Sequence, residues 1–456
     1  LNNQEQKAKI SHMRIIKKAK DISIFLNTLR RRASGADSAI ERVVNSILSD
    51  VKKNGDEAVL RYTRKFDYEN AKSLILKPSE ISKFADKADR KIVKALEFSA
   101  ERIRRFHEMQ KEESWMVRDS EYRKLPANKN TKPAFSHALL GQLIRPIERV
   151  GIYVPGGKAS YPSSVLMNVI PAQVADVREI AVCVPTPQGE INPYVMAAIK
   201  MLGIKEAYRI GGAQAVGAMA YGTQTIKRVD KIVGPGNIYV AAAKRMVFGE
   251  VDIDMIAGPS EILIIADASA NPAFIAADLL SQAEHDELAS SVLITDSKIL
   301  AEDVSREIER QMAKLKRRTI ASKSLKNYGA VIIVRDIAHA VKLSNDIAPE
   351  HLEIMTEKPA AVLPEIKNAG AIFLGRWTPE PLGDYSAGPN HTLPTGGTAR
   401  FFSPLGVYDF IKRSSLLSFT REGFMKIAKT VETIADIEGL EAHGNTVRVR
   451  MRDKRR

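Results

Sequence analysis

The chain is 456 residues long, 44% of its residues are hydrophobic, and its formal net charge is +15. This length can bury the cores of two or more domains, and no apolar run approaches the roughly 20 residues that a transmembrane helix needs. The charged start lacks the apolar stretch of a secretory signal. The single cysteine, Cys183, excludes an intrachain disulfide and is expected to pack in a buried strand. We therefore expect a cytoplasmic globular protein without a membrane segment.

Basic residues gather towards the two ends of the chain, between positions 17 and 32 and again from position 448. Nucleic-acid-binding proteins commonly combine a basic surface with exposed aromatic side chains. Here only 6% of the residues are aromatic, and the basic runs flank the middle of the chain. We favour a solvated surface that also attracts anionic cofactors. A nucleic-acid-binding protein stays as an alternative of a different class.

The first third of the chain is predicted to be mainly helical. Apolar residues recur at helical spacing from Ile40 to Val51, and Gly55 follows as a stop signal. A second amphipathic stretch covers residues 91–110. Ahead of both, we expect an N-terminal helical segment over residues 1–35.

From Arg149 onward, short apolar strands alternate with helices. Strands are predicted at 150–154, 179–184, 207–210 and 231–233, and then at 262–266, 291–295, 330–334, 352–355 and 371–374. Helices are predicted between them at 195–202, 273–283 and 301–315, with another ending at 347. This βαβ rhythm builds largely parallel sheets covered by helices, so the predicted fold class is α/β with two tandem units.

The last part of the chain is predicted to lack a core of its own. After Pro379 a long loop rich in Gly and Pro leads to helical segments at 407–412 and 422–437. These segments are too short to bury a separate core. We expect this extended, partly helical tail to pack on another part of the molecule or on a partner subunit.

Three glycine-rich turns follow predicted strands. They are Pro155-Gly156-Gly157, Gly211-Gly212-Ala213-Gln214 and Gly234-Pro235-Gly236-Asn237. Such turns let backbone N–H groups approach phosphates at the carboxyl ends of parallel strands. None gives the G-x-G-x-x-G fingerprint, so each alone fits an ordinary tight connection. Together they favour a nucleotide cleft.

Several polar residues stand out in a chain that has only eight histidines. Gln282 and His285 end a predicted helix, Glu350 and His351 are adjacent, and Asp384, His391 and His443 lie further on. A helical i, i+3 pair combined with a distant Asp and a distant His is typical of a transition-metal site. A histidine beside a carboxylate is suited to proton transfer. The pattern predicts metal-assisted chemistry on a small molecule.

From about residue 14 to 450 the chain resembles the histidinol dehydrogenase family. The resemblance rests on several long motifs that occur in the family's order. They are Gly151-Ile152-Tyr153-Val154-Pro155-Gly156-Gly157, Gly211-Gly212-Ala213-Gln214-Ala215, Asp230-Lys231-Ile232-Val233-Gly234-Pro235-Gly236-Asn237, Ala257-Gly258-Pro259-Ser260-Glu261, Asp278-Leu279-Leu280-Ser281-Gln282-Ala283-Glu284-His285, Pro349-Glu350-His351-Leu352, Gly383-Asp384-Tyr385, Asn390-His391-Thr392-Leu393-Pro394-Thr395, Glu438 and Ala442-His443.

The resemblance implies a role for each matching position. Gln282, His285, Asp384 and His443 match zinc ligands, and His443 would come from the other subunit of a homodimer. Glu350 and His351 match the acid/base pair. Tyr153, Gln214 and Asn237 match NAD-binding positions on an incomplete Rossmann-like unit. The implied substrate contacts are Ser260, Gln282, His285, His351, Asp384, Glu438 and His443, with His391 nearby.

The family's reaction is a four-electron oxidation of an amino alcohol. The resemblance implies that L-histidinol is oxidised through L-histidinaldehyde to L-histidine by two NAD-linked hydride transfers, at the end of histidine biosynthesis. His351 would accept the hydroxyl proton and Glu350 would activate water. One zinc per subunit would hold the substrate nitrogens. A relative that oxidises another alcohol, such as a sulfonated diol, stays as an alternative.

The resemblance also implies a domain plan. Residues 1–35 would form an N-terminal helical segment, and 36–148 with 259–380 a discontinuous α/β domain. Residues 149–258 would form the Rossmann-like NAD-binding domain, and 381–456 a C-terminal dimerisation tail, with Glu438 and His443 donated across the dimer interface.

Overall fold

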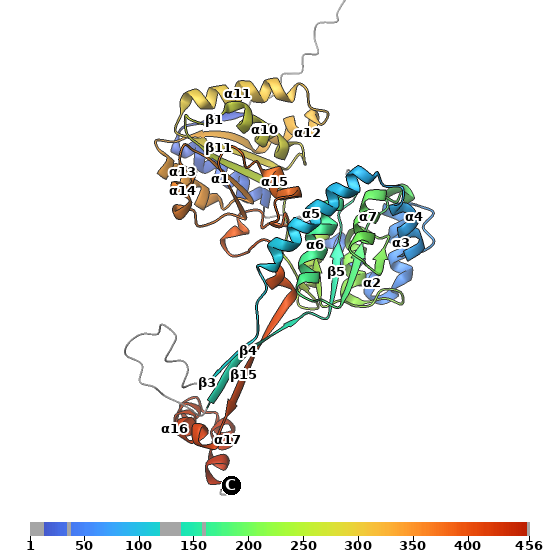
Figure 1. Cartoon of the computed structure of the whole chain (residues 1–456), viewed down its shortest axis with the longest axis vertical. Helices are drawn as coiled ribbons and strands as arrows, with labels where there is room; N and C mark the ends of the chain where they lie inside the picture. Colours follow the sequence, from blue (N-terminus) through green and yellow to red (C-terminus); the bar gives the residue numbers. More distant parts are fainter. Residues whose placement is uncertain (1–12, 34–37, 119–137, 157–160, 454–456) are drawn as a thin grey trace, which may run out of the picture. The chain divides into compact units, whose positions relative to one another are not determined.

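The computed structural model describes residues 13–33, 38–118, 138–156 and 161–453 (Figure 1). The chain forms two compact units. The first comprises Leu1–Gln110 and Ile147–Phe410, and the second comprises Lys111–Pro146 and Ile411–Arg456. Within the described ranges, no helix is both long enough and apolar enough to cross a bilayer.

The first unit contains a six-stranded parallel sheet, here called sheet A, with strand order β1-β12-β11-β10-β13-β14. Its strands are β1 (Arg14–Ile16), β12 (Gly329–Ile333), β11 (Ser290–Thr295), β10 (Glu261–Ala266), β13 (His351–Met355) and β14 (Ala371–Leu374). Its helices are α1 (Ala19–Ala33), α10 (Pro272–Ala283), α11 (Lys298–Met312), α12 (Arg318–Tyr328), α13 (Ile337–Ile347), α14 (Pro359–Val362) and α15 (Glu380–Tyr385).

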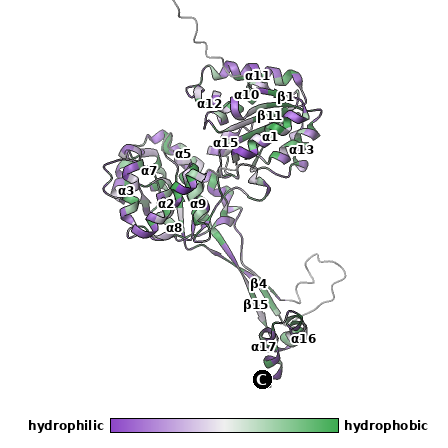
Figure 2. Ribbon diagram, turned by 180° about the vertical axis from the view of Figure 1, so that it is seen from behind, coloured by the Kyte–Doolittle hydropathy of each residue, from purple (hydrophilic) through white to green (hydrophobic). Residues whose placement is uncertain are grey.

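Helices cover both faces of sheet A because its central strands are apolar on both sides. In β10, Ile262 and Ile264 pack into a core with α10, α11 and α12, whereas Leu263 and Ile265 pack into a core with α1 and α13. Figure 2 shows polar and apolar residues alternating along α11, whose apolar side is buried. Strands buried on both faces are expected in parallel sheets with βαβ connections. The predicted α/β class is confirmed.

A second six-stranded sheet, here called sheet B, has the order β2-β7-β6-β5-β8-β9 and is parallel except at β2. Its strands are β2 (Ile75–Leu76), β7 (Glu206–Tyr208), β6 (Glu179–Cys183), β5 (Arg149–Tyr153), β8 (Lys231–Val233) and β9 (Asp252–Ile253). Its helices are α2 (Ser38–Asn54), α3 (Asp56–Phe66), α4 (Pro78–Ala85), α5 (Arg90–Glu108), α6 (Pro162–Val174), α7 (Pro193–Met201), α8 (Gly212–Tyr221) and α9 (Ile238–Val247).

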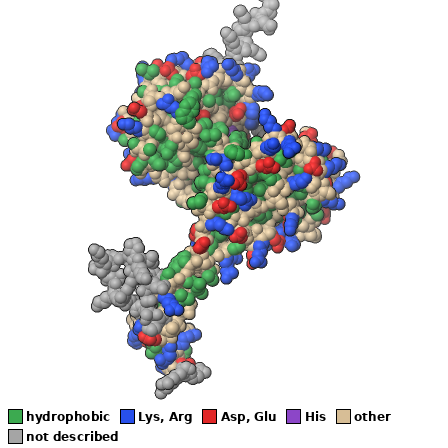
Figure 3. Space-filling model, viewed as in Figure 1, with side chains coloured by type: hydrophobic (Ala, Val, Ile, Leu, Met, Phe, Trp, Pro, Cys, Tyr) green, Lys and Arg blue, Asp and Glu red, His purple; other side chains and the backbone are tan. Residues whose placement is uncertain are grey.

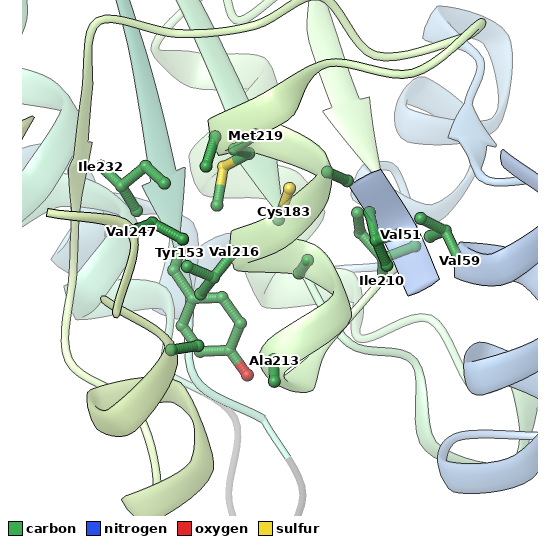
Figure 4. Close-up of a cluster of buried hydrophobic side chains, with 14 of the residues drawn as sticks. Val51, Val59, Tyr153, Cys183, Ile210, Ala213, Val216, Met219, Ile232 and Val247 are labelled. Atoms are coloured by element: carbon green, nitrogen blue, oxygen red, sulfur yellow. The ribbon is translucent and has the colours of Figure 1, made fainter. Parts of the chain in front are cut away.

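One core of sheet B lies between its strands and helices α2, α3, α8 and α9 (Figure 4). Cys183 lies in this core and is fully buried. Burial in apolar surroundings raises the pKa of its thiol. The thiol therefore stays neutral and serves as packing, as the sequence predicts.

Helices α2 to α5 pack on sheet B rather than on sheet A. Helix α2 contacts α8 and α9, α4 contacts α7, α5 contacts α6, and β2 pairs with β7. This packing differs from the predicted grouping of 36–148 with 259–380. The amphipathic pattern of a helix shows that one side is buried but not which sheet buries it.

The second unit contains an antiparallel sheet and a helix pair. Its strands, in the order β15-β4-β3, are β15 (Ile411–Phe419), β4 (Ala138–Pro146) and β3 (Trp115–Arg118). Helices α16 (Arg421–Ile437) and α17 (Glu441–Arg452) pack on each other. Residues 381–410, predicted to belong to the tail, fold with the first unit.

The predicted helix at 407–412 is wrong after its first turn. A short 3-10 helix covers Val407–Phe410, and strand β15 begins at Ile411. Along this strand Lys412, Arg413, Ser414 and Ser415 are all exposed, so no apolar alternation marks it as a strand. The pairing of all its residues with β4 supplies the hydrogen bonds that the local pattern does not predict.

Candidate active site

Glu350 and His351 are held by the backbone of a single residue, Glu261. His351 begins β13 and lies beside β10, which Glu261 begins. The N–H of Glu261 donates to Oε2 of Glu350 (2.8 Å), and Nδ1 of His351 donates to the carbonyl oxygen of Glu261 (2.9 Å). Because Nδ1 carries the proton of a neutral imidazole in this arrangement, Nε2 is free to accept one.

Helix α15 places two carboxyl groups next to that free nitrogen. Oε1 of Glu380 and Oδ1 of Asp384 each lie 3.8 Å from Nε2 of His351. His351, Glu380 and Asp384 each offer one ligand atom within 4.8 Å of the others. The sequence predicts a loop here and therefore misses Glu380. The i, i+4 spacing of Glu380 and Asp384 could have indicated a shared helical face.

Burial and neighbouring charges shift the pKa values of His351 and of the carboxyl groups around it in opposite directions. Burial would lower the pKa of His351, but the carboxylates of Glu350, Asp384 and Glu380 raise it well above its usual value. Burial raises the pKa of Glu350 to about 7 and that of Glu380 to about 8. Burial acts against ionisation of Asp384 too, but the interaction with the nearby His351 ring lowers its pKa to about 2.

Gln282 and His285 lie at the end of α10. Gln282 is 1% exposed, and neither atom of its amide has a hydrogen-bond partner among the described residues. Burial lowers the pKa of His285, and the charges of Asp384 and His351 both reach it. A buried amide without a partner normally indicates a missing ligand or water. Nitrogen and oxygen donors amid several carboxylates fit a divalent metal such as zinc.

A second set of buried carboxyl groups lies next to Glu380 and Gln282. Oε1 of Glu353 accepts from the N–H of Glu380 (2.8 Å), and Oε2 of Glu380 accepts from the hydroxyl of Ser281 (3.3 Å). Burial raises the pKa of Asp278, one turn before Gln282, to about 6 and that of Glu353 well above its usual value. Asp278 and Ser281 lie in a motif of the family, but the sequence predicts no role for them or for Glu353.

His391 connects the site to helix α6. Its Nδ1 donates to the carbonyl oxygen of Asp384 (3.1 Å), and its Nε2 lies 3.4 Å from the hydroxyl of Ser164. Ser260 lies just before β10, and its carbonyl oxygen accepts from the N–H of Ser290 (3.0 Å). His391 is thus bonded to the backbone of Asp384, and Ser260 directly precedes Glu261, whose backbone binds Glu350 and His351.

Glu438 and His443 belong to the second unit. Glu438 caps the carboxyl end of α16, and His443 lies in the first turn of α17. Both side chains are exposed in the single chain. Without them, the first unit brings His285, Glu350, His351 and Asp384 close enough for their charges to interact, and Gln282 lies three residues before His285.

The predicted cofactor residues lie at the carboxyl ends of the strands of sheet B. Tyr153 ends β5, and its hydroxyl accepts from the N–H of Gly212 (3.1 Å). A Cβ on Gly234, whose φ is +113°, would lie 2.1 Å from the carbonyl oxygen of Tyr153. Only glycine fits this approach. The glycine-rich turns at Gly212 and Gly234 therefore both pack against Tyr153.

The other two predicted cofactor residues begin helices. The side chain of Asn237 caps α9, accepting from the N–H groups of Tyr239 (3.0 Å) and Val240 (3.1 Å). Gln214 is 1% exposed in the first turn of α8, and its Nε2 has no partner among the described residues. The unpaired amide N–H group of Gln214 lies beside a glycine-rich turn and a helix N-terminus, and Asn237 lies at another helix N-terminus. This arrangement fits the diphosphate of a dinucleotide. Gly157, part of the first turn, lies outside the described residues.

Comparison with known proteins identifies the family. The family model described as histidinol dehydrogenase matches residues 30–451. The chain belongs to the histidinol dehydrogenase family. It is therefore an oxidoreductase. The protein named histidinol dehydrogenase from Geobacter sulfurreducens is 56% identical over 416 residues, which cover 91% of this chain and 94% of that relative.

A more distant relative and a solved structure agree with this assignment. The Aquifex aeolicus protein of the same name is 52% identical over 430 residues, covering 94% of this chain and 96% of the relative. The crystal structure of histidinol dehydrogenase from Elizabethkingia anophelis matches with a TM-score of 0.88 and 36% identity, over 97% of this chain and 98% of that one. The whole family fold is thus present.

Proposed function

We propose that the enzyme oxidises L-histidinol through L-histidinaldehyde to L-histidine, the last steps of histidine biosynthesis. The observation that carries this proposal is the attachment of Glu350 and His351 to the backbone of Glu261, beside Asp384 and Glu380. This arrangement gives a buried proton acceptor and a buried carboxyl group next to a set of metal donors. A two-step oxidation needs all three.

Gln282, His285 and Asp384 of one subunit would hold a zinc ion, with His443 supplied by a second subunit. Zinc would bind the amino and imidazole nitrogens of the substrate and so fix the position of the reacting carbon. The surplus of buried carboxyl groups around His351 favours a dication here. Ser260, His391 and Glu438 would complete the substrate site, Glu438 also from the second subunit.

In the first oxidation His351 would accept the hydroxyl proton of the alcohol at Nε2. The carbon–hydrogen bond of the same carbon breaks as its electron pair leaves with the hydride, and the aldehyde forms. A bound dication would offset the surrounding carboxylates and so favour the neutral ring of His351 over the imidazolium. In that neutral ring the bond from Nδ1 to Glu261 leaves Nε2 unprotonated. Holding the proton acceptor in place in this way can supply part of the roughly 7–11 kcal/mol available from positioning.

In the second oxidation Glu350 would take a proton from water as the water oxygen adds to the aldehyde carbon. Because burial raises its pKa to about 7, Glu350 can exchange a proton near neutral pH. The former carbonyl oxygen would take back the proton that His351 received in the first oxidation, which gives the neutral hydrate and frees Nε2 of His351. The hydrate would then lose its hydride as His351 accepts a hydroxyl proton again, and the carboxylic acid forms. The hydride acceptor in both steps would be NAD. Tyr153, Gln214 and Asn237 would hold it at the carboxyl ends of the strands of sheet B.

The proposed assembly is a cytoplasmic homodimer in which residues 149–258 bind NAD and the C-terminal tail dimerises. A basic nucleic-acid-binding surface is less favoured. On the face shown in Figure 3, Lys and Arg side chains are interspersed with Asp and Glu rather than gathered in one stripe.

The test is NADH formation with zinc-loaded enzyme and L-histidinol. We expect about two NADH for each L-histidine formed and little turnover of a sulfonated diol. Absence of NADH with L-histidinol would overturn the proposal, and turnover of the diol alone would favour the alternative substrate class.

A further inference from the structure

The side chain of Arg32, in the last turn of α1, contacts the site although Arg32 is far from the other site residues in the sequence. Its side chain is only 1% exposed and forms an ion pair with Oε1 of Glu261. Nη1 also donates to the carbonyl oxygens of Leu288 (2.7 Å) and, at longer range, Ser260 (3.5 Å). The guanidinium lies 5.6 Å from the centre of the Tyr328 ring. Arginine suits such a site because its planar fork can satisfy several acceptors at once.

Glu261 connects this arginine to the acid/base pair. Its side chain binds Arg32, while its N–H and carbonyl groups bind Glu350 and His351. The carboxyl group is 9% exposed, and its second oxygen has no partner among the described residues. Without the guanidinium, this buried carboxylate would lose its ion-pair partner. Glu261 would then have to move or become protonated.

We propose that Arg32 is a positioning residue that fixes Glu261 and thereby sets the geometry of Glu350 and His351. The inference rests on the proposed roles of these two residues. Removing Arg32 should lower kcat much more than it changes KM, since within the described part of the chain its only contact with a proposed substrate residue is the long bond to the backbone oxygen of Ser260. A displacement of about 1 Å at a reacting group can cost about 100-fold in rate.

A purely structural role for Arg32 predicts a different outcome. Helix α1 is already anchored to sheet A by the buried side chains of Ile22, Phe25 and Leu29. The helix should therefore stay in place when Arg32 is replaced. An effect confined to stability would leave the turnover of the folded fraction unchanged.

The experiment compares R32M, R32K and the exposed control R30M in the full-length, zinc-loaded enzyme. We expect R32M to lose about 100-fold in kcat with KM and zinc content within about threefold, R32K to recover part of the loss, and R30M to match the parent. A folded R32M with a kcat within about threefold of the parent would overturn the inference.

The double variant R32M/E261Q separates positioning from folding. Neutralising Glu261 removes the uncompensated buried charge, so we expect stability to return while kcat stays low. Recovery of both would show a structural role and overturn the inference. This variant also serves if R32M alone does not fold.

A second readout does not depend on turnover. Nitrogen NMR of the histidine rings reports whether Nδ1 or Nε2 of His351 carries the proton, with His339 on α13 as the control. We expect the His351 signal to change in R32M and that of His339 to stay the same. An unchanged His351 signal would overturn the inference. A changed signal in an enzyme that does not oxidise L-histidinol would overturn only the proposed function.

Discussion

Oε1 of Glu380 lies 3.8 Å from Nε2 of His351, on the side of the ring opposite the bond from Nδ1 to Glu261. The position of Glu380 is fixed by two contacts. Its N–H donates to Glu353, and its carboxyl group accepts from Ser281. Glu380 therefore belongs to the environment of the proposed base, although no sequence motif points to it.

Replacement of Glu380 tests this relationship. We expect E380Q to lower kcat about tenfold, because groups that orient a catalytic or metal-binding side chain commonly contribute 10- to 100-fold. Steady-state kinetics with L-histidinol would measure the effect. E365Q, at an exposed position, is the control. A kcat equal to that of the parent would show that Glu380 does not influence His351.

Zinc binding should depend on His285 and His443. We expect H285N and H443N each to lower the zinc content per subunit, because each removes a proposed nitrogen ligand. Metal analysis of the purified proteins would measure this, with H339N as the control. Full occupancy in either variant would remove that histidine from the ligand set.

The proposed contribution of His443 from a second subunit can be tested by mixing variants. After subunit exchange, a dimer of H285N with H443N contains one site with both histidines intact. Random exchange should therefore restore about a quarter of the parent activity from two inactive proteins. If both residues of a site came from one chain, the mixture would stay inactive.

Gly234 should be sensitive to the smallest substitution. A Cβ there would lie 2.1 Å from the carbonyl oxygen of Tyr153, in addition to the cost of a φ of +113°. We expect G234A to lower the free energy of unfolding by about 3 kcal/mol and to weaken NAD binding.

Gly249 provides the matched control for this substitution. It has a φ of +102°, but a Cβ there would meet no atom within 4 Å. We expect G249A to lower the free energy of unfolding by only about 1 kcal/mol, which is the cost of the backbone conformation alone. Urea unfolding and a calorimetric NAD titration would measure both variants. Equal losses would show that the contact with Tyr153 is unimportant.

Asp67 should make stability depend on pH. Burial raises its pKa from 3.8 to about 6, so the folded state binds a proton more tightly than the unfolded state. Its stabilising contribution is present in full below about pH 4 and is lost as the pH rises through 6.

Replacing Asp67 by asparagine removes this loss of stability at high pH. We expect D67N to be more stable than the parent by about 1 kcal/mol at pH 8, a value reduced for partial exposure, and by less at pH 5. Urea unfolding at the two pH values measures the difference. A larger gain at pH 5 than at pH 8 would contradict the assignment.

The sequence predicts nine strands of the two sheets from their apolar runs, most of which are buried on both faces. It misses the short edge strands β1, β2 and β9, and β1 lies within the segment 1–35 predicted to be helical. It also predicts Gln282, His285, Glu350, His351 and Asp384, which lie in motifs of the family. It does not predict Arg32, Glu261 or Glu380 as parts of the site. Their roles depend on contacts between segments far apart in the chain, and local spacing does not record such contacts.

Strand β1 has a consequence for the order in which the protein can form. Arg14 pairs with Ala330, so this strand has no partner in sheet A until the ribosome has made residues more than 300 positions further on. Sheet B needs only residues up to about 253 and can be complete by then. During synthesis, the half that carries the proposed NAD site can thus fold before the half that carries Glu350 and His351, while β1 and α1 stay exposed to chaperones and proteases.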